Sequence, residues 1–287
     1  MEATELLKKV RRIEIKTRGL SRHIFAGEYH SAFKGKGMSF SEVREYQFGD
    51  DIRNIDWNVT ARFNKPYIKV FEEERELTVM LLIDFSGSRN FGTNDRFKDV
   101  LIAEVSAVLA FSAISNNDKI GVIFFTDKIE KFIPPKKGRK HVLHIIRELI
   151  KFKPESELTN ISQALKYLTN LIKKRSTVFI ISDFLDTNFE KALQIAAYKH
   201  DLIALSVYDI RETELPSVGF IKLIDAETKE EMWVNTSNKK VRTKYAKDRL
   251  EFEKNLYGMF NRYGVDYTKF ATDKDYVKML ISLFKRR

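Results

Sequence analysis

The chain has 287 residues, of which 43% are hydrophobic and 32% charged, a composition that predicts a folded globular protein rather than a disordered one. It contains no cysteine, which excludes disulfide frameworks, thiolate zinc sites and cysteine nucleophiles. The net charge of +11 is spread thinly along the sequence and by itself selects no nucleic-acid or lipid partner.

Neither an export signal nor a membrane anchor is apparent in the sequence. Residues 1–18 are rich in charge and lack the continuous apolar segment of a secretory signal. No apolar run approaches the ~18 to 20 residues that a membrane span requires. We therefore expect a cytoplasmic protein without an integral membrane segment.

Residues 1–76 are expected to form an amino-terminal unit, with a helix from Met1 to about Lys16 and a largely irregular stretch over residues 19–64. So long a stretch without clear secondary structure is either functional or held in place by side-chain contacts. Arginines alternate there with aspartates and aromatic residues, which predicts bidentate ion pairs and stacking. The candidates for anchoring this segment to the main domain, or for a second docking surface, are Arg44, Asp50, Arg53, Asp56, Trp57 and Arg62.

Residues 77–287 alternate short apolar runs with segments of helical periodicity. The predicted strands are 77–83, 119–125, 129–133, 177–182, 202–208 and 266–271, and a hairpin is expected from 220–224 and 231–234. The predicted helices are 97–115, 140–151, 161–172, 189–199 and 241–263, with one more helix at the carboxyl end, preceded by a capping-box sequence at 272–275.

Strands separated by helices at this rhythm predict an α/β fold, with a mainly parallel, Rossmann-like sheet covered by helices on both faces. The run at 129–133, which Pro134 and Pro135 follow, is expected to be an edge strand. In such sheets ligands bind beyond the carboxyl ends of the strands. Polar residues that follow the predicted strands are therefore the first candidates for a site.

The strongest such signal is the sequence Asp84-Phe85-Ser86-Gly87-Ser88, which follows the first predicted strand. Gly87 permits a tight turn, so that one carboxylate and two hydroxyls emerge together at the end of the strand. Asp183 follows the strand 177–182, and Thr159 lies in the loop before the helix that begins at residue 161. The alternative is that Asp84 and Ser86 merely cap the next helix and that Asp183 is an ordinary loop residue.

Two carboxylates and three hydroxyls would form an all-oxygen site, which suits Mg²⁺ or Mn²⁺ and suits Ca²⁺ less well. Because hydroxyls are neutral, an ion held in this way keeps net positive character and an open position. That position would attract a carboxylate from another molecule. The sequence thus predicts a metal-dependent binding site formed by Asp84, Ser86, Ser88, Thr159 and Asp183.

These five residues resemble the metal-ion-dependent adhesion site of von Willebrand factor A domains, whose pattern is D-x-S-x-S, then a threonine, then an aspartate. The resemblance implies that Ser86, Ser88 and Thr159 coordinate the ion directly or through water, and that Asp84 and Asp183 do so mostly through water. It also implies that an acidic side chain of a partner completes the coordination shell.

A second resemblance covers nearly the whole chain. The string from Gly49 to Trp57, with Gly35-Lys36-Gly37 before it and Ala61-Arg62 after it, is similar to that of the bacterial family called domain of unknown function 58. Members of this family are often encoded beside MoxR-type AAA+ ATPases and other von Willebrand A proteins. The resemblance implies an adaptor in a chaperone-like or assembly system, with such an ATPase or another von Willebrand A protein as its partner.

An enzyme is the less favoured interpretation. The five histidines show no clear metal-ligand pattern, and no nucleophile elbow, P-loop or dinucleotide fingerprint is present. A metal-dependent phosphoester hydrolase remains one alternative, although it would need more carboxylates than two. A basic nucleic-acid-binding protein is the second alternative, but we expect no nucleic-acid partner, because the paired basic residues lie near segment ends, where solvated faces account for them.

Overall fold

The computed structural model describes residues 39–72, 77–90 and 97–287. The described residues belong to two compact units, and the boundary between them along the chain lies between Leu77 and Thr78. The helix predicted at residues 1–16 lies outside the described residues, as does the stretch up to residue 38.

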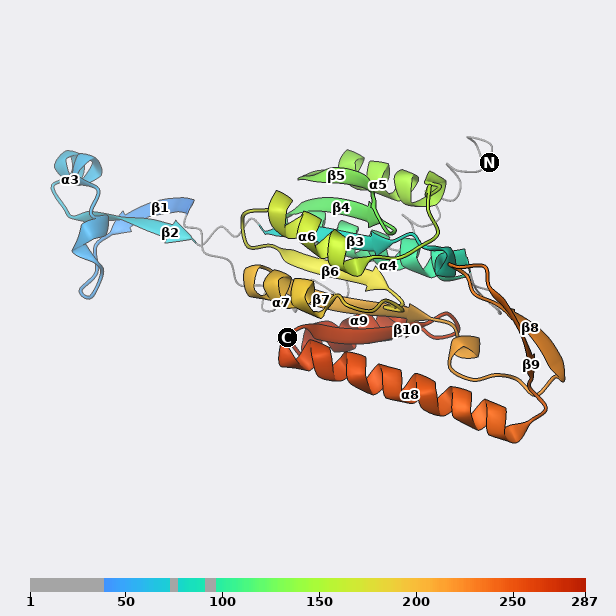
Figure 1. The fold of residues 1–287 in the computed structure, drawn as a ribbon. Coiled ribbons are helices and arrows are strands. Elements are labelled where there is room, and N and C mark those ends of the chain that lie inside the picture. The colour runs from blue at the N-terminus through green and yellow to red at the C-terminus, as the bar shows by residue number, and fades with distance from the viewer. Residues whose placement is uncertain (1–38, 73–76, 91–96) are drawn as a thin grey trace. The chain divides into compact units, whose positions relative to one another are not determined.

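The smaller unit is built on two antiparallel strands, β1 (Ser39–Glu45) and β2 (Tyr67–Glu72), shown at the blue end of the chain in Figure 1. A 3₁₀ turn, η1 (Ile52–Asn54), and a short helix, α3 (Trp57–Phe63), connect them. Residues 39–64 are therefore more regular than the irregular stretch predicted from the sequence. Neither strand was among those predicted. β1 carries little apolar signal, whereas β2 contains apolar residues that the sequence interpretation did not assign to a strand. Among the hydrophobic side chains whose burial is described in this unit, only that of Ile68 is buried.

The larger unit is organised around a six-stranded sheet with the order β10-β7-β6-β3-β4-β5. Its strands are β3 (Thr78–Asp84), β4 (Lys119–Phe125), β5 (Ile129–Lys136), β6 (Thr177–Ser182), β7 (Asp201–Tyr208) and β10 (Asp266–Ala271). All neighbours are parallel except β5, which runs antiparallel to β4 at the edge. The mainly parallel sheet is the one predicted. The edge strand is longer than expected because it continues through Pro134 and Pro135, which an edge position tolerates.

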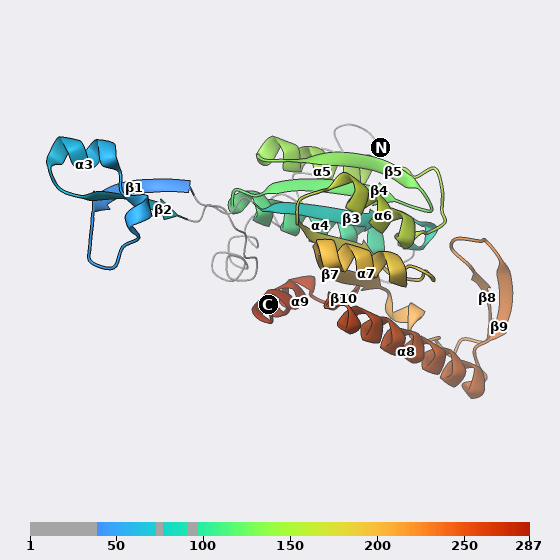
Figure 2. The same ribbon diagram turned by 60° about the vertical axis from the view of Figure 1, so that its left-hand side comes forward.

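Helices cover both faces of this sheet (Figures 1 and 2). They are α4 (Lys98–Ser115), α5 (Arg139–Lys151), α6 (Ile161–Leu171), α7 (Glu190–Lys199), α8 (Lys239–Arg262) and α9 (Tyr276–Lys285). One face packs against α6, α7 and the carboxyl-terminal part of α8 in a single apolar cluster. On the other face lie α4, which is buried along nearly its whole length, and α9, whose Phe284 meets Phe179 of β6 with ring centroids 6.3 Å apart.

The segment between β7 and α8 leaves the sheet. It starts with a 3₁₀ turn, η3 (Ile210–Glu212), and continues into the predicted hairpin of β8 (Phe220–Ile224) and β9 (Glu231–Asn235). Much of the hairpin is exposed, including 69% of Trp233 and 70% of Phe220. Its tip, residues 225–230, returns to the main body of this unit, as described below.

Two smaller features complete the fold. Asp275, rather than Thr272, caps α9: its carboxylate accepts a hydrogen bond from the Val277 amide at 3.0 Å. The hydroxyl of Thr272 donates instead to the buried Asp209 carboxylate at 2.8 Å, so the predicted capping box is replaced by a tertiary hydrogen bond. Within the described ranges, no helix is both long and apolar enough to cross a membrane.

Candidate metal centre

The candidate residues lie at the point of the sheet where the strand order reverses. From β3 the chain proceeds to β4 and β5 on one side, whereas β6, on the other side of β3, is followed by β7 and β10. The loops after β3 and β6 therefore diverge and leave a crevice, which is the usual ligand position in open α/β sheets. Asp84 is the last residue of β3, and Asp183 immediately follows β6.

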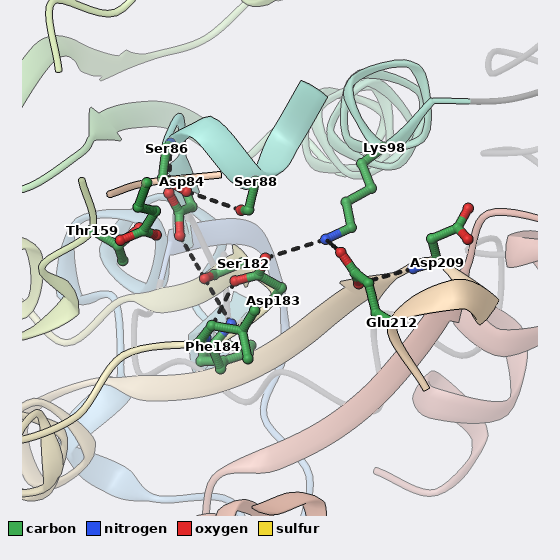
Figure 3. Close-up of polar contacts among 12 residues, drawn as sticks. Asp84, Ser86, Ser88, Lys98, Thr159, Ser182, Asp183, Phe184, Asp209 and Glu212 are labelled. Atoms are coloured by element: carbon green, nitrogen blue, oxygen red, sulfur yellow. Dashed lines mark hydrogen bonds and ion pairs between the residues drawn. The ribbon is translucent and has the colours of Figure 1, made fainter. Parts of the chain in front are cut away.

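The loop after β3 is folded around the carboxylate of Asp84 (Figure 3). Oδ1 of Asp84 accepts a hydrogen bond from the amide of Ser86 at 2.9 Å, and Oδ2 accepts one from the hydroxyl of Ser182 at 2.7 Å. The hydroxyl oxygens of Ser86 and Ser88 lie 3.1 Å apart. These contacts bring together the first three residues of the predicted set and add Ser182, which the sequence did not single out as a site residue.

The alternative of a helix cap is excluded for α4. Its N-cap position is Phe97, which makes no side-chain capping bond. Asp84 instead stabilises its own loop, next to the short 3₁₀ turn η2 (Gly87–Asn90).

Burial, and after it the nearby negative charge of Asp183, raise the pKa of Asp84 to about 7, although the hydrogen bonds from Ser182 and Ser86 act in the opposite direction. Only 3% of Asp84 is exposed, and among the described residues no cationic side chain lies within ion-pair distance of it. The guanidinium of Arg89 acts on Asp84 only at longer range, so an ionised carboxylate in this position has no direct ion-pair partner among the described residues. A bound cation would supply one.

Asp183 has a different environment, because it forms an ion pair with a buried lysine. The ammonium of Lys98, at the start of α4, lies 3.2 Å from Oδ2 of Asp183 and also contacts the carboxylate of Glu212. Burial lowers the pKa of Lys98, but the two carboxylates outweigh it, so the pKa is raised overall and the side chain stays charged. Lys98 thus fixes Asp183 and links the candidate centre to η3.

The backbone after β6 is held in an unusual conformation. Phe184 has a φ of +59°, in the left-handed region that a bulky residue rarely adopts. Its ring is fully buried and packs against Phe260 of α8 with ring centroids 5.2 Å apart. This packing holds the turn that directs Asp183 into the crevice.

A cavity of about 10 Å³ lies between these side chains, and its polar lining is Asp84, Ser88, Ser182 and Asp183 together with the cationic Arg89 and Lys98. Such a volume holds one water molecule or one small ion. No group of three or more histidine, aspartate or glutamate side chains within the described ranges could hold a metal by itself, so any ion here would depend on the hydroxyls. Lys98 is already paired with Asp183 and Glu212, and the guanidinium of Arg89 lies over the ring of Phe85, 4.0 Å from its centroid. The carboxylate of Asp84 and the paired hydroxyls therefore still fit a hard cation such as Mg²⁺ or Mn²⁺.

Thr159 lies in the loop that packs against the Asp84 loop, because the amide of Gly87 donates to the carbonyl of Glu157 at 2.8 Å. The hydroxyl of Thr159 does not bond to the other candidates but donates to Glu227, at 2.7 Å, on the tip of the β8–β9 hairpin. Its oxygen can still offer a lone pair to an ion. Four of the five predicted residues are thus joined by hydrogen bonds or by the shared cavity, while Thr159 reaches the site through its loop.

The expected role of Gly87 changes. Gly87 does not adopt a positive φ. Glycine is required here because the backbone of Ala226 approaches it closely: a Cβ atom at position 87 would lie 2.3 Å from the carbonyl oxygen of Ala226. The hairpin tip therefore rests directly on the candidate metal loop.

The candidate anchoring residues of the smaller unit make contacts within that unit. Arg44 and Asp50 form a bidentate ion pair with distances of 2.8 and 2.9 Å, Arg53 pairs with Asp51 at 3.1 Å, and Asp56 caps α3. In α3, Trp57 is 71% exposed, and Arg62 is exposed in the last turn. The ion pairs stabilise the unit itself, and the attachment of this segment to the main domain stays a prediction.

Sequence reasoning missed Lys98, Ser182, Glu212 and Glu227. A signal for Lys98 was present: a lysine in the first turn of an otherwise apolar helix opposes the helix dipole and indicates an acidic partner. Glu212 and Glu227 carry no such signal, because they lie in turns whose tertiary contacts span many residues of sequence.

Comparison with known proteins gives one family and several distant structures. Residues 42–255 match the family described as Protein of unknown function DUF58. The uncharacterized protein Rv1480 of Mycobacterium tuberculosis is 30% identical over 227 residues, which are 78% of this chain and 72% of that protein. The uncharacterized protein YeaD of Bacillus subtilis is 30% identical over 109 residues, which are 38% of this chain and 25% of that protein.

Among solved structures, the hypothetical protein BatB from Bacteroides thetaiotaomicron is similar with a TM-score of 0.46 and 14% identity, over 73% of this chain and 98% of that one. The VWA domain of SpRpn10 is similar with a TM-score of 0.43 and 9% identity, over 74% of this chain and 96% of that one. The observed sheet confirms the predicted α/β fold with a mainly parallel, Rossmann-like sheet, and the family match confirms the resemblance found in the sequence.

Proposed function

The chain belongs to the family described as Protein of unknown function DUF58, and from that premise we propose that it is a non-enzymatic module that binds another protein through a divalent cation. The cation is Mg²⁺ or Mn²⁺, held by Asp84, Ser86, Ser88, Thr159 and Asp183. The observation that carries the proposal is the convergence of Asp84, Ser88 and Asp183 on one small cavity at the switch point of the sheet.

The chemistry of this site favours binding over catalysis. Lys98 already neutralises much of the charge of Asp183, and among the described residues no histidine lies in contact with the cavity to act as a base. The hydroxyls of Ser86 and Ser88 donate no charge to an ion, which would remain an effective acceptor for an external carboxylate. A bound metal would supply a positive charge at the carboxyl ends of the strands, and the chain would supply the oxygen ligands.

The partner in this proposal carries an exposed aspartate or glutamate. The resemblance on which the sequence interpretation rests favours a MoxR-type AAA+ ATPase or another von Willebrand A protein, within a bacterial chaperone-like or assembly system. The acidic residue of the partner would complete the coordination of the ion, so that complex formation depends on the metal.

Titration calorimetry of the full chain with Mg²⁺ and Mn²⁺ tests the site. We expect one binding event in the wild type and none in Asp84→Asn, which keeps the shape of the side chain and one of its two acceptor oxygens but removes its charge. Asp248→Ala, an exposed position on α8, is the matched control and should bind like the wild type. Equal heats for the wild type and Asp84→Asn would show that the ion binds elsewhere.

A partner is tested separately, by mixing the chain with a purified MoxR-type ATPase and comparing complex formation in Mg²⁺ and in EDTA. The proposal predicts a complex that chelator dissolves and that Asp84→Asn does not form. A complex that is indifferent to both would place the contact outside the metal centre.

A further inference from the structure

The tip of the β8–β9 hairpin is attached to the candidate metal centre by three separate contacts. The hydroxyl of Thr159 donates to Glu227, the carbonyl of Ala226 lies against Gly87, and the ammonium of Lys229 pairs with the carboxylate of Glu157. These contacts reach two of the three loops that carry candidate site residues, the one after β3 and the one before α6.

The tip is also rigid in itself. The carboxylate of Asp225 accepts hydrogen bonds from the amides of Glu227 and Thr228 at 2.9 and 2.8 Å, and the ammonium of Lys229 donates to the carbonyl of Ala226 at 2.8 Å. Such an Asx turn fixes the direction in which the next side chains leave the backbone. Glu227 is therefore held in position rather than placed by chance.

Burial separates the tip from the body of the hairpin. Ala226 and Glu227 are partly buried, whereas Phe220, Met232 and Trp233 in the strands are more than 60% exposed. The exposed strand residues thus face solvent, whereas the tip contacts the rest of the unit through Ala226, Glu227 and Lys229.

Glu227 is a partly buried carboxylate that touches a candidate site residue. Among the described residues the ammonium of Lys98 is engaged by Asp183 and Glu212, and that of Lys229 by Glu157, so neither forms an ion pair with Glu227. A carboxylate held beside a threonine of the site, without an ion pair of its own among the described residues, has the chemistry expected of the acidic residue that would complete the shell of an ion.

We propose that the β8–β9 hairpin is an internal ligand of this centre: Glu227 occupies the position that the acidic residue of a partner would take, and a partner must displace it. This inference rests on the proposed function. The hairpin would then determine specificity. To coordinate the ion, an acidic segment of a partner must displace Glu227 and also fit the space that the tip leaves.

The test compares the full-length wild type with Glu227→Gln and with Glu230→Gln. The second variant makes the same change of charge on the same tip, at an exposed side chain. The affinity for Mn²⁺ is measured by calorimetry, and the number of water molecules on the bound Mn²⁺ by water-proton relaxation. We expect Glu227→Gln to bind Mn²⁺ roughly tenfold more weakly and with one more water, since a carboxylate ligand or its equivalent is lost. Glu230→Gln should match the wild type.

Hydrogen exchange of the amides of residues 225–230 gives a readout that needs no metal. In EDTA the tip should exchange faster in Glu227→Gln than in Glu230→Gln, because a neutral amide accepts the hydrogen bond of Thr159 more weakly than a carboxylate does. Mg²⁺ should slow this exchange in the wild type and in Glu230→Gln, and less in Glu227→Gln. If Glu227→Gln binds Mn²⁺ with the affinity and hydration of the wild type, the internal ligand is refuted while the metal site stands. If the wild type shows no binding that depends on Asp84, the proposed function and this inference fail together.

Discussion

Asp84 is a buried acid whose environment favours the protonated form until a cation arrives. Its raised pKa results mainly from burial and secondly from the charge of Asp183. A folded-state pKa above the unfolded value near 4 means that this residue stabilises the fold fully below about pH 4 and that the contribution is lost as the pH rises through about 7. Without metal, the protein therefore carries a destabilising charge at neutral and higher pH.

Replacing Asp84 by asparagine should remove that charge. In EDTA at pH 8, we expect Asp84→Asn to be more stable than the wild type by roughly 2 kcal/mol, with the difference vanishing near pH 4. Urea unfolding at several pH values measures this directly. Saturating Mg²⁺ should close the gap at pH 8 by stabilising the wild type alone, because only the wild type binds the ion. A variant less stable than the wild type at every pH would show that Asp84 acts chiefly through its hydrogen bonds to Ser86 and Ser182.

Individual residues also show where sequence reasoning stops. Asp84, Ser86 and Ser88 are adjacent in sequence, so their clustering follows from one turn and could be predicted. Ser182 is only the last residue of the predicted strand 177–182, yet its hydroxyl bonds to Asp84 across 98 positions of sequence. Such a contact depends on the strand order, which the sequence pattern does not specify.

At the scale of elements, the buried strands were predicted to within a residue. β4, β6 and β10 have the predicted bounds, because each is a short run of apolar or β-branched residues between polar segments. The β8–β9 hairpin was predicted as well, but its packing against the metal loop was not. A turn has no periodicity from which its tertiary contacts could be read.

The contact between the hairpin and the metal loop depends on the absence of a side chain at position 87. In Gly87→Ala, the new Cβ would meet backbone atoms of Ala226, which cannot rotate away, so either the loop or the hairpin must shift. We expect a loss of about 1–3 kcal/mol in unfolding free energy and faster hydrogen exchange at residues 225–230. Exchange in the central strands should stay as in the wild type.

Gly258→Ala is the matched control for that substitution. Gly258 lies within α8, where a Cβ atom meets nothing within 4 Å, so alanine should stabilise the helix by about 0.5–1 kcal/mol. Should Gly87→Ala instead unfold like the wild type and leave the exchange of the tip unchanged, the hairpin would not rest on the loop in solution.

At the scale of the whole molecule, the fold class followed from the alternation of strands and helices, while the location of the site followed from the order of the strands. The smaller unit was the least predictable part, since its strands are held by backbone pairing and by surface ion pairs such as that of Arg44 with Asp50. Its exposed Trp57 and Arg53 remain candidates for docking. The net charge of +11 gave no guide to function, because the cavity of the candidate site is lined by two carboxylates and two cationic side chains, whose charges balance.

Anomalous diffraction from a crystal of the full chain soaked in Mn²⁺ tests the central claim most directly. The account predicts one strong peak in the cavity between β3 and β6, about 2 Å from the hydroxyl oxygens of Ser86 and Ser88. It would be contradicted by a map in which that cavity stays without a peak at saturating Mn²⁺, or in which the ammonium of Lys98 fills the position assigned to the ion.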